Sequence, residues 1–427
     1  MRRLVCTFIA GLLCMTGTPA LAQEAKITGP LTLQQCLDLA MKNQIDVITG
    51  RNNVIIAQGR SAEALSQYLP QISIQNNAFS WGSQSVLSRV TTGTALNISQ
   101  NVFDGGLREA SNTAARYGVT ENRAGLTRTV QTVTFNVTTA YYDALRAKHL
   151  AEVDESNVTY SEELRKQVEA RIEQGDTAQV DLLPVEAQLA NARVSLLTAQ
   201  NLVRTSALQL QIAVGLSPQA GFDIAEVEGV PSPEVGALQL NVSSALIARP
   251  DILQSKASTG AAGASLKAAR LNLYPRPVIS GQYQKSVQGG FTTGSGQVVG
   301  GIVFDLFNGG ANRAVYREAK ASQANAIVRQ QQTVKDIQAQ VEEAYLNLIS
   351  GKDRLAASEL SMTASQANYD AQKERYTEGV ATLLDTLNAQ LQLVTAQTNA
   401  VQARYDYLTA IAQMDYAVGK QGGFNAN

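Results

Sequence analysis

The chain has 427 residues, of which 35 are Lys or Arg and 36 are Asp or Glu, so its formal net charge is −1. Charged residues make up only 17% of the chain, whereas soluble domains carry about 25%. A pI near 6.1 argues against nucleic-acid binding, which needs a positively charged surface. One His and three Cys exclude most His/Cys metal sites and most histidine-dependent catalysis.

Residues 1–22 have the three parts of a secretory signal peptide. Arg2 and Arg3 precede a short apolar run, and Ala20-Leu21-Ala22 supplies small residues at the cleavage site. The run is shorter than the about 20 residues that a membrane-spanning helix needs. We therefore expect export and cleavage after Ala22, which leaves Cys36 as the only cysteine and permits no intrachain disulfide.

The rest of the chain repeats itself at an offset of 204 residues. Matches at this offset are Phe103-Asp104-Gly105-Gly106 with Phe307-Asn308-Gly309-Gly310, Ala140-Tyr141 with Ala344-Tyr345, Arg171 with Arg375, Gly175 with Gly379, Asp181 with Asp385, and Ala213-Val214-Gly215 with Ala417-Val418-Gly419. One offset over so many matches predicts two copies of one unit. The copies are expected at residues 23–215 and 243–427, with a Pro/Gly-rich equatorial linker at 216–242 between them.

Each copy is predicted to contain a long helical hairpin. No proline follows Pro277, and the remaining 150 residues are rich in the helix formers Ala, Gln, Leu and Glu. The hairpin tips are expected near Gly175 and Gly379. Each tip lies 69 residues after a Gly-Gly pair, at Gly106 and Gly310, a length that corresponds to about 100 Å of helix. The sequence thus predicts a tall helical column.

Two apolar seams run along each returning helix. In the first copy they are Val180, Leu183, Ala187, Ala190, Val194 and Leu197, and Leu182, Val185, Leu189, Ala192, Leu196, Ala199 and Val203. In the second copy they are Leu384, Leu387, Leu391, Val394 and Val401, and Ala389, Leu393, Ala396, Ala400 and Ala403. One stripe is enough for a globular helix, so two heptad seams favour a helix with a neighbour on each side, as in a curved wall or closed ring. A fully buried helix is the alternative.

Residues 71–104 and 276–308 have a different composition, with Ser, Thr, Asn, Gly and Gln between spaced apolar residues. Ile72 and Ile74, for example, alternate with Ser73 and Gln75. Each segment is expected to form a strand, a turn and a return strand. Alternation without charge is typical of membrane β-barrels, but a soluble hairpin has the same pattern, so the strands alone leave both interpretations open.

These features together resemble the TolC family of outer-membrane efflux proteins, over essentially the whole chain after the predicted cleavage site. The motifs that carry the resemblance are Leu31-Thr32-Leu33 with Cys36-Leu37-Asp38-Leu39-Ala40, the strands led by Pro70 and Pro275, the duplicated Phe-x-Gly-Gly, and Arg375-Tyr376-x-x-Gly379 with Leu384-Asp385-x-Leu387. The resemblance implies a mainly α fold with a membrane β-barrel. In a homotrimer, four strands per chain give a twelve-stranded β-barrel, continuous with a periplasmic α-helical barrel.

The resemblance also implies a function. Members of the family are passive outer-membrane channels of tripartite efflux or type I secretion systems. They receive substrates from an inner-membrane RND or ABC transporter through a periplasmic adaptor, and outer-membrane lipid surrounds their barrel. By this resemblance, the tips at Gly175 and Gly379 are expected to dock the adaptor.

Acidic residues just beyond the tip narrow the periplasmic entrance in members of this family, and Asp385 lies at such a position. Asn388 replaces the next acidic residue, so the resemblance implies at most one acidic ring here. Asp181 and Tyr376 match positions that hold the closed tip together, whereas Ala381 stands where a relative has Arg, which implies a weaker latch. Solvated polar residues at helix ends are an equally good interpretation of these side chains.

Other classes of protein fit less well. An enzyme needs a site, but His149 lies in a helical stretch without a nucleophile motif or a second His. No Walker or G-x-G-x-x-G loop is present, so we expect no cofactor and no energy-coupling activity. A general diffusion porin does not fit a helical majority. A water-soluble periplasmic coiled-coil adaptor or scaffold is the serious alternative, although it leaves two strand hairpins with few charged residues unexplained.

Overall fold

The computed structural model describes residues 29–77, 93–217, 223–227, 229–231, 233, 236–288 and 291–420. The predicted signal peptide at 1–22 lies outside the described residues. The elements in chain order are α1 (Leu33–Asn43), α2 (Ile45–Ser66), β1 (Gln71–Asn77), β2 (Gly93–Phe103), α3 (Leu107–Gln174), η1 (Gln179–Asp181), α4 (Leu182–Val214), α5 (Leu238–Ala248), α6 (Pro250–Leu271), β3 (Arg276–Gln288), β4 (Phe291–Val303), α7 (Ala311–Thr377) and α8 (Leu383–Val418). The prediction of a mainly helical chain is confirmed.

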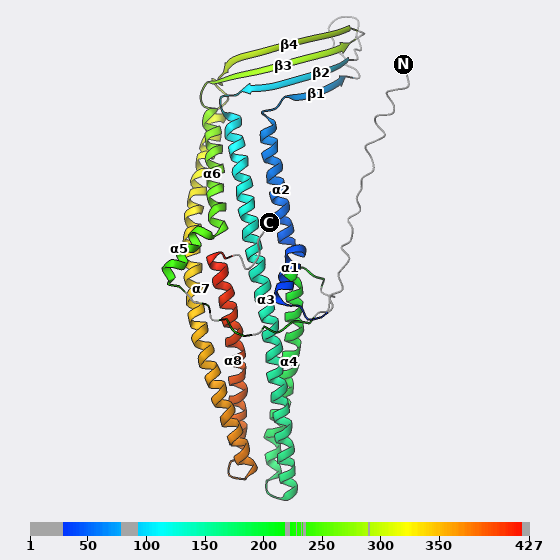
Figure 1. The fold of residues 1–427 in the computed structure, drawn as a ribbon, viewed down its shortest axis with the longest axis vertical. Helices are drawn as coiled ribbons and strands as arrows, with labels where there is room; N and C mark the ends of the chain where they lie inside the picture. The colour runs from blue at the N-terminus through cyan, green and yellow to red at the C-terminus, as the bar shows by residue number, and fades with distance from the viewer. Residues whose placement is uncertain are drawn as a thin grey trace, which may run out of the picture.

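The helices form one long column with the sheet at one end and two helical hairpin tips at the other (Figure 1). α3 has 68 residues and α7 has 67, so each is about 100 Å long. α4 and α8 return along the lower half, and α2 and α6 lie along the upper half (Figure 1). No helix in the described part of the chain is long and apolar enough to cross a bilayer.

The lower half of the column has four helices side by side. Their order across Figure 1 is α7, α8, α3 and α4, and the contacts α7–α8, α8–α3 and α3–α4 agree with it. The two inner helices, α8 and α3, therefore have a helical neighbour on each side. The two outer helices, α4 and α7, form the lateral edges of this layer.

Burial differs between the two apolar seams of α4. The seam that contains Val185 and Ala192 packs within the chain, where these side chains are 0% and 2% exposed. The seam that contains Leu183 and Leu197 does not, and these residues remain 62% and 66% exposed. A fully buried helix is therefore the wrong interpretation for a single chain, because one apolar seam of α4 has no cover in it.

The four strands form one antiparallel sheet in the order β1-β2-β3-β4. Directly paired residues share a face and successive residues alternate faces. The register therefore gathers Ile72, Ile74, Leu96, Ile98, Ile279, Tyr283, Val287, Val298 and Ile302 on one face, with Lys285 as a charged exception. The opposite face is mainly polar, with apolar exceptions that include Phe291, Val299 and Val303. Its polar residues are Ser73, Gln75, Asn97, Ser99, Asn101, Ser280, Gln282, Gln284, Ser295 and Gln297.

Nothing in the described chain covers the apolar face of the sheet. Ile72 and Ile74 are 68% and 72% exposed, and Val298 and Ile302 are 79% and 74% exposed. A soluble hairpin would place such a face on a core. The sheet instead projects away from the helical column (Figure 1), so the pattern of exposure favours the membrane interpretation of these strands.

The apolar core is concentrated at mid-height, where the short helices α1 and α5 join the column (Figure 1). Cys36 is fully buried there, and burial raises the pKa of its thiol to about 11. Tyr141 of α3 lies in the same core, and its hydroxyl donates to the carbonyl oxygens of Ala225 and Leu31 at 2.6 and 3.1 Å. The linker and the N-terminal segment are thus tied to α3.

Two matching joints fasten the returning helices at this level. Gln44, just before α2, donates from Nε2 to the carbonyl oxygen of Ala213 near the end of α4 at 3.3 Å. Arg249, just before α6, donates from Nη1 to the carbonyl oxygen of Ala417 near the end of α8 at 3.1 Å. Both side chains supply donors to carbonyls that a helix end leaves unpaired, so each returning helix ends against the helix of the upper column.

Gly215, at the end of α4, is needed at its joint for two reasons. Its φ is +78°, and an added Cβ would lie 2.9 Å from the backbone carbonyl of Asn43. Gly175 at the tip has a similar φ of +82°, but nothing lies within 4 Å of its Cβ position. A side chain at either position costs about 1–2 kcal/mol for the left-handed backbone, but only a side chain at Gly215 also clashes with another backbone segment. Comparing substitutions at the two positions therefore isolates the cost of the clash.

We expect Gly215→Ala to lower the thermal unfolding temperature more than Gly175→Ala does, because only the first substitution pushes two backbone segments apart. The measurement is thermal unfolding of the purified protein followed by circular dichroism. Equal shifts for the two variants would mean that the close approach at Gly215 contributes nothing to stability.

Candidate functional site at the hairpin tips

Both hairpins turn through a glycine with a left-handed backbone. At Gly175, φ is +82° and the amides of Gly175 and Asp176 donate to the carbonyl oxygens near the end of α3. At Gly379, φ is +76° and the same pattern closes the end of α7. This is the usual glycine termination of a helix, and it explains the two glycines that the sequence placed at the tips.

Asp385 lies in the first turn of α8 and caps that helix. Its Oδ2 accepts from the backbone N–H of Thr382 at 3.1 Å and from the Thr382 hydroxyl at 2.7 Å, while the Thr382 Oγ1 accepts from the Asp385 N–H at 3.2 Å. These hydrogen bonds from Thr382 hold the pKa of Asp385 below its ordinary value. The carboxylate is exposed, so it is a structural cap that also places a negative charge at the tip.

The other acidic candidate, Asp181, occupies the N-cap position of α4 at the end of η1 but makes no side-chain capping hydrogen bond. It is half-buried. Asn388, one turn along α8 from Asp385, is exposed. The structure thus brings Asp385 and Asn388 together on α8 and leaves Asp181 on the other hairpin.

Tyr376 is 4% exposed at the end of α7, and in the described part of the chain its buried hydroxyl has no hydrogen-bond partner. Burial raises the pKa of Tyr376; the guanidinium of Arg171 opposes this rise and the charge of Asp181 adds to it. Asp181 therefore acts on Tyr376 through space, without a hydrogen bond between the two side chains.

Arg171 of α3 makes a polar contact between the two tips, which we call the Arg171 clamp. Its Nη2 donates to the carbonyl oxygens of Tyr376 at 2.6 Å and Thr377 at 3.0 Å, and its Cζ lies 4.5 Å from the centre of the Tyr376 ring. The cation thus sits at the negative end of the α7 dipole and on an aromatic face. In the sequence, Arg171 stood out only because it matches Arg375 at the repeat offset of 204 residues. This repetition was the one feature from which its role could have been suspected.

An apolar cluster lies at the same level. Leu164, Val168, Val185 and Tyr376 form its buried centre, and Ile172, Leu182, Ala381, Leu383 and Leu387 pack against it. Its members come from both hairpins, so the cluster also holds the tips together. Ala381, where the resemblance implies a lost Arg, contributes here as a small apolar side chain, and Arg171 supplies a guanidinium to the tip from the other hairpin.

A buried polar contact lies above this cluster, between α8 and α3. Gln390 is 0% exposed, and its Nε2 donates to Asn157 Oδ1 and Ser161 Oγ, both at 2.8 Å. The amide fixes the register of the two helices, because any sliding leaves buried polar groups unpaired. This contact could not be predicted from the sequence, since glutamine and serine on a helix usually face water.

The described residues hold no group of three or more His, Cys, Asp and Glu side chains that is suited to bind a metal ion. His149 lies between Glu152 and Glu226, with ring nitrogens 2.9 Å from each carboxylate, and its ring stacks on Tyr405 at 5.8 Å. These contacts make the histidine part of a hydrogen-bond network at mid-height.

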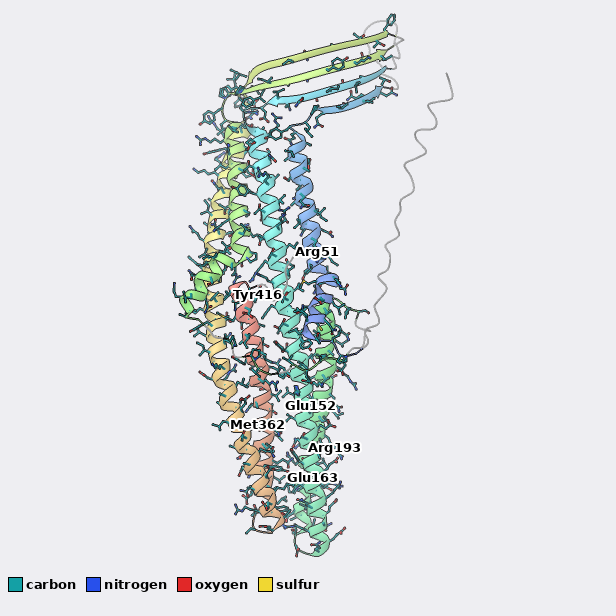
Figure 2. The ribbon with its side chains drawn as sticks, in the orientation of Figure 1. Arg51, Glu152, Glu163, Arg193, Met362 and Tyr416 are labelled. Carbon is teal, nitrogen blue, oxygen red and sulfur yellow. The ribbon has the colours of Figure 1, made fainter. Side chains whose placement is uncertain are left out.

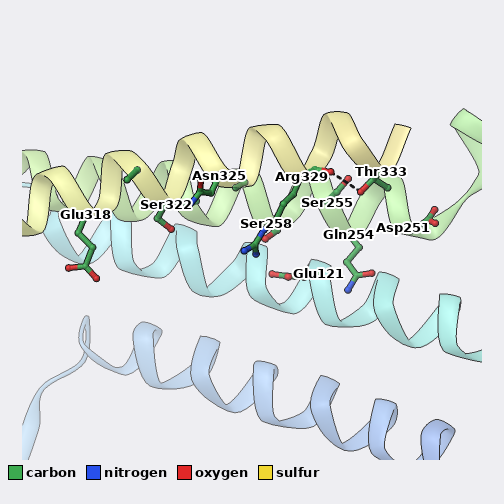
Figure 3. A pocket seen from close by; sticks show the side chains of 13 residues that line it. Glu121, Asp251, Gln254, Ser255, Ser258, Glu318, Ser322, Asn325, Arg329 and Thr333 are labelled. Atoms are coloured by element: carbon green, nitrogen blue, oxygen red, sulfur yellow. Dashed lines mark hydrogen bonds between the residues drawn. The ribbon is translucent and has the colours of Figure 1, made fainter. Parts of the chain in front are cut away.

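A cleft of about 580 Å³ lies in the upper column between α3, α6 and α7. Figure 3 shows polar side chains along it, with Glu121, Asp251 and Glu318 as the acidic residues and Arg329 as the basic one. It lies far from the hairpin tips, and none of the predicted site residues lines it.

The tall helical column, the sheet at its end with an uncovered apolar face, and the paired tips are the geometry expected of a chain of the outer-membrane channel class. The model of the family described as outer membrane efflux protein matches residues 37–216 and again residues 241–420. The chain belongs to this family, and the predicted resemblance is confirmed.

Curated relatives and solved structures agree with this assignment. The outer membrane efflux protein BepC of Brucella suis is 27% identical over 96% of this chain and 90% of its own length. The pyoverdine export outer membrane protein OpmQ of Pseudomonas putida is 25% identical over 92% of this chain and 87% of its own length. The outer membrane protein VceC of Vibrio cholerae has the same fold, with a TM-score of 0.81 and 18% identity over 91% of this chain and 96% of that one.

We expect Arg171→Ala to loosen the tips, because two carbonyl oxygens lose a charged donor. Hydrogen bonds to charged groups contribute about 1.5–3 kcal/mol, so amide hydrogen exchange in peptides around Tyr376 should accelerate about ten-fold or more. Arg165→Ala is the matched control, because the ion pair of Arg165 in the described chain is with Glu169 of the same helix, on its half-exposed face. Unchanged exchange at the α7–α8 tip in Arg171→Ala would contradict the clamp.

Proposed function

We propose that three copies of this chain form a passive exit duct through the outer membrane. The observation that carries the proposal is the four-stranded sheet, in which the outer sides of β1 and β4 have no strand neighbour in the described chain. Unpaired backbone groups are not tolerated in a bilayer, so β4 of one copy must pair with β1 of the next. Twelve strands from three copies close such a ring.

The two faces of the sheet support this arrangement. The apolar face, with Ile72, Ile74, Val298 and Ile302 exposed, suits contact with lipid, and the face of Ser, Asn and Gln suits a water-filled lumen. We therefore assign outer-membrane lipid to the first face and the transported substrate to the second.

We also propose that the chain consists of two structural copies that continue the ring as a helical tunnel. Two observations support this: the family model matches twice at starting positions 204 residues apart, and Gly175, Gly215 and their partners Gly379 and Gly419 all have a positive φ. A trimer then contributes six hairpins to one periplasmic tunnel, and residues 1–22 direct the chain to export.

The proposed partners are a periplasmic adaptor and an inner-membrane transporter of the RND or ABC class. The exposed tips around Gly175 and Gly379 form the surface on which an adaptor docks. Relatives include proteins named for pyoverdine export and for secretion of alkaline protease, so this family serves both small molecules and proteins. No cofactor takes part, because the duct itself does no chemistry and depends on its partners for energy.

Asp385, Asn388, Asp181 and Tyr376 are proposed to form the periplasmic gate. Asp385 carries an exposed charge one turn beyond the tip, and threefold symmetry brings three such carboxylates around one axis. Asn388 is neutral, so this site supplies one acidic ring. Asp181 and Tyr376 lie on opposite hairpins of one chain and are held close by the Arg171 clamp.

Assembly is the first test of this proposal. We expect the purified protein to be a trimer in detergent and to fractionate with the outer membrane, measured by light scattering and by membrane fractionation. A monomer in the soluble periplasmic fraction would overturn the proposal and favour the soluble adaptor or scaffold.

The gate has its own test, in planar-bilayer recordings. Asp385→Asn should reduce cation preference and block by multivalent cations, because the ring loses its charge while the amide oxygen can still cap α8. Glu378→Gln, which removes one charge from the same exposed tip, is the control and should retain the wild-type behaviour. Wild-type selectivity in Asp385→Asn would place the acidic ring elsewhere, with Asp181 as the next candidate.

A further inference from the structure

At mid-height, the linker lies against one face of the helical wall. On α3, the Tyr141 hydroxyl donates to the carbonyl oxygen of Ala225 at 2.6 Å, and the Lys148 Nζ donates to the Glu226 carboxylate at 2.8 Å. On α8, the Arg404 guanidinium donates to a backbone carbonyl oxygen of the linker at 3.5 Å. A segment that covers the wall as a second layer must lie outside a duct that stays open, so these three contacts mark the outer face.

Charged side chains lie on the opposite face at the same level. Successive residues of a helix are rotated by about 100°, so a residue two positions from a linker contact points away from the linker. On α3, Asp143 follows Tyr141 by two residues and Arg146 precedes Lys148 by two. On α8, Asp406 follows the linker contact by two. These three side chains therefore face the interior of the proposed duct.

Ion pairs join these side chains into one cluster that extends to α7. Arg146 lies at its centre, with Nη2 2.6 Å from Asp143 Oδ1 and Nη1 3.4 Å from Asp406 Oδ1. The other carboxylate oxygen of Asp406 is 3.7 Å from Nη2 of Arg354 on α7. The cluster thus connects three neighbouring helices across the inner face of the wall.

The four side chains line a recess of about 280 Å³ between α3, α7 and α8, which we call the mid-height recess. In Figure 2, Tyr416 on α8 and Glu152 on α3 mark the levels just above and just below it. Threefold symmetry of the proposed trimer places three such recesses around the duct at one level.

The repeat shows that a helix of this kind forms without the charges. Asn347 and Ser350 of α7 stand 204 residues after Asp143 and Arg146, and α7 is a continuous helix through both positions. Neutral side chains are therefore compatible with the same place in the wall. The charges on α3 are better explained by a role toward the interior of the duct.

Arg354 is the cation of the recess that is open to a solute. Its side chain is 60% exposed, and in the described chain its only ion pair is the 3.7 Å contact with Asp406. Arg146, by contrast, is held between two carboxylates. Exposed ion pairs are weak, so a solute can displace Asp406 from Arg354. The planar guanidinium presents parallel N–H donors that match the oxygens of a carboxylate or phosphate.

We propose that the mid-height recess is a contact site for an oxyanion, a carboxylate or phosphate group of a transported solute, and that Arg354 binds it. The inference rests on the proposed function, because only a duct brings a solute to this face of the wall. Asp406 competes with the solute for Arg354. This competition keeps binding weak, as conduction requires, since a solute that enters must also leave.

Cysteine labelling tests whether the recess lines the duct. Arg354→Cys channels are recorded in a planar bilayer while a negatively charged methanethiosulfonate reagent is added, and we expect conductance to fall in one step for each copy. Lys148→Cys is the matched control, because it replaces a long cationic side chain on the outer face, and its conductance should not change. The wild-type chain is the blank, because the Cys36 thiol is buried. Unchanged conductance in Arg354→Cys would place the recess outside the duct and overturn the proposal.

Block of the current by citrate and by tripolyphosphate tests the chemistry. Arg354→Gln should raise the half-blocking concentration of both anions about ten-fold, since hydrogen bonds to a charged group are lost. Asp406→Asn removes the competing carboxylate and should lower it. Arg354→Lys keeps the charge without the planar fork, so it should retain the wild-type preference between K⁺ and Cl⁻ and still lose block. Wild-type block in Arg354→Lys, or weaker block in Asp406→Asn, would contradict an oxyanion site at Arg354.

Light scattering on the same samples separates failure of the recess from failure of the duct. A monomer, or a chain that forms no channel, overturns the proposed function and the recess together. Trimeric channels that neither anion blocks overturn the recess alone. Trimeric channels in which Arg354→Gln and Asp406→Asn shift the block in opposite directions support the oxyanion site.

Discussion

A wall one helix thick cannot bury its own apolar surface, and the rest of the structure depends on that constraint. Every helix in such a wall needs a neighbour on both sides. In the lower column α3 and α8 have two neighbours each, whereas α4 and α7 lie at the edges (Figure 1). The sheet is under the same constraint, because β1 and β4 leave backbone donors and acceptors unpaired on their outer sides. Column and sheet thus share one requirement, a neighbour at each lateral edge.

Much of this architecture could be predicted from the sequence because it follows from spacing. The distance between glycine turns fixed the length of the helices, and heptad spacing indicated that each returning helix has two apolar sides. Spacing does not say which neighbour covers a side. Leu387 and Leu183 occupy equivalent positions in two similar seams, yet the first packs at the tip and the second is 62% exposed. That difference depends on tertiary contacts, which a one-dimensional pattern does not contain.

The candidate site was predicted less completely, for a related reason. Asp385 was selected for its charge, but its hydrogen bonds are with Thr382 in its own helix turn. Arg171 was not selected, although it joins the tips, because its partners Tyr376 and Thr377 lie more than 200 residues away in sequence and are backbone carbonyls. A carbonyl oxygen has no side-chain identity to recognise. The contact of the buried Gln390 amide could not be predicted for the same reason, since its partners on α3 are distant in sequence.

The contacts between the two halves of the chain also determine when folding can be completed. Gln131 in α3 donates to the carbonyl oxygen of Gly419, a separation of 288 residues, and β2 pairs with β3 across α3, α4, α5 and α6. The side of α3 that holds Asn157 and Ser161 stays open until α8, the last helix, has been synthesised. Contacts of such long range make folding slow, and the emerging chain exposes apolar seams throughout that time. The N-terminal half therefore exposes apolar surface until the C-terminal residues have been synthesised, and during that time it must be protected from aggregation.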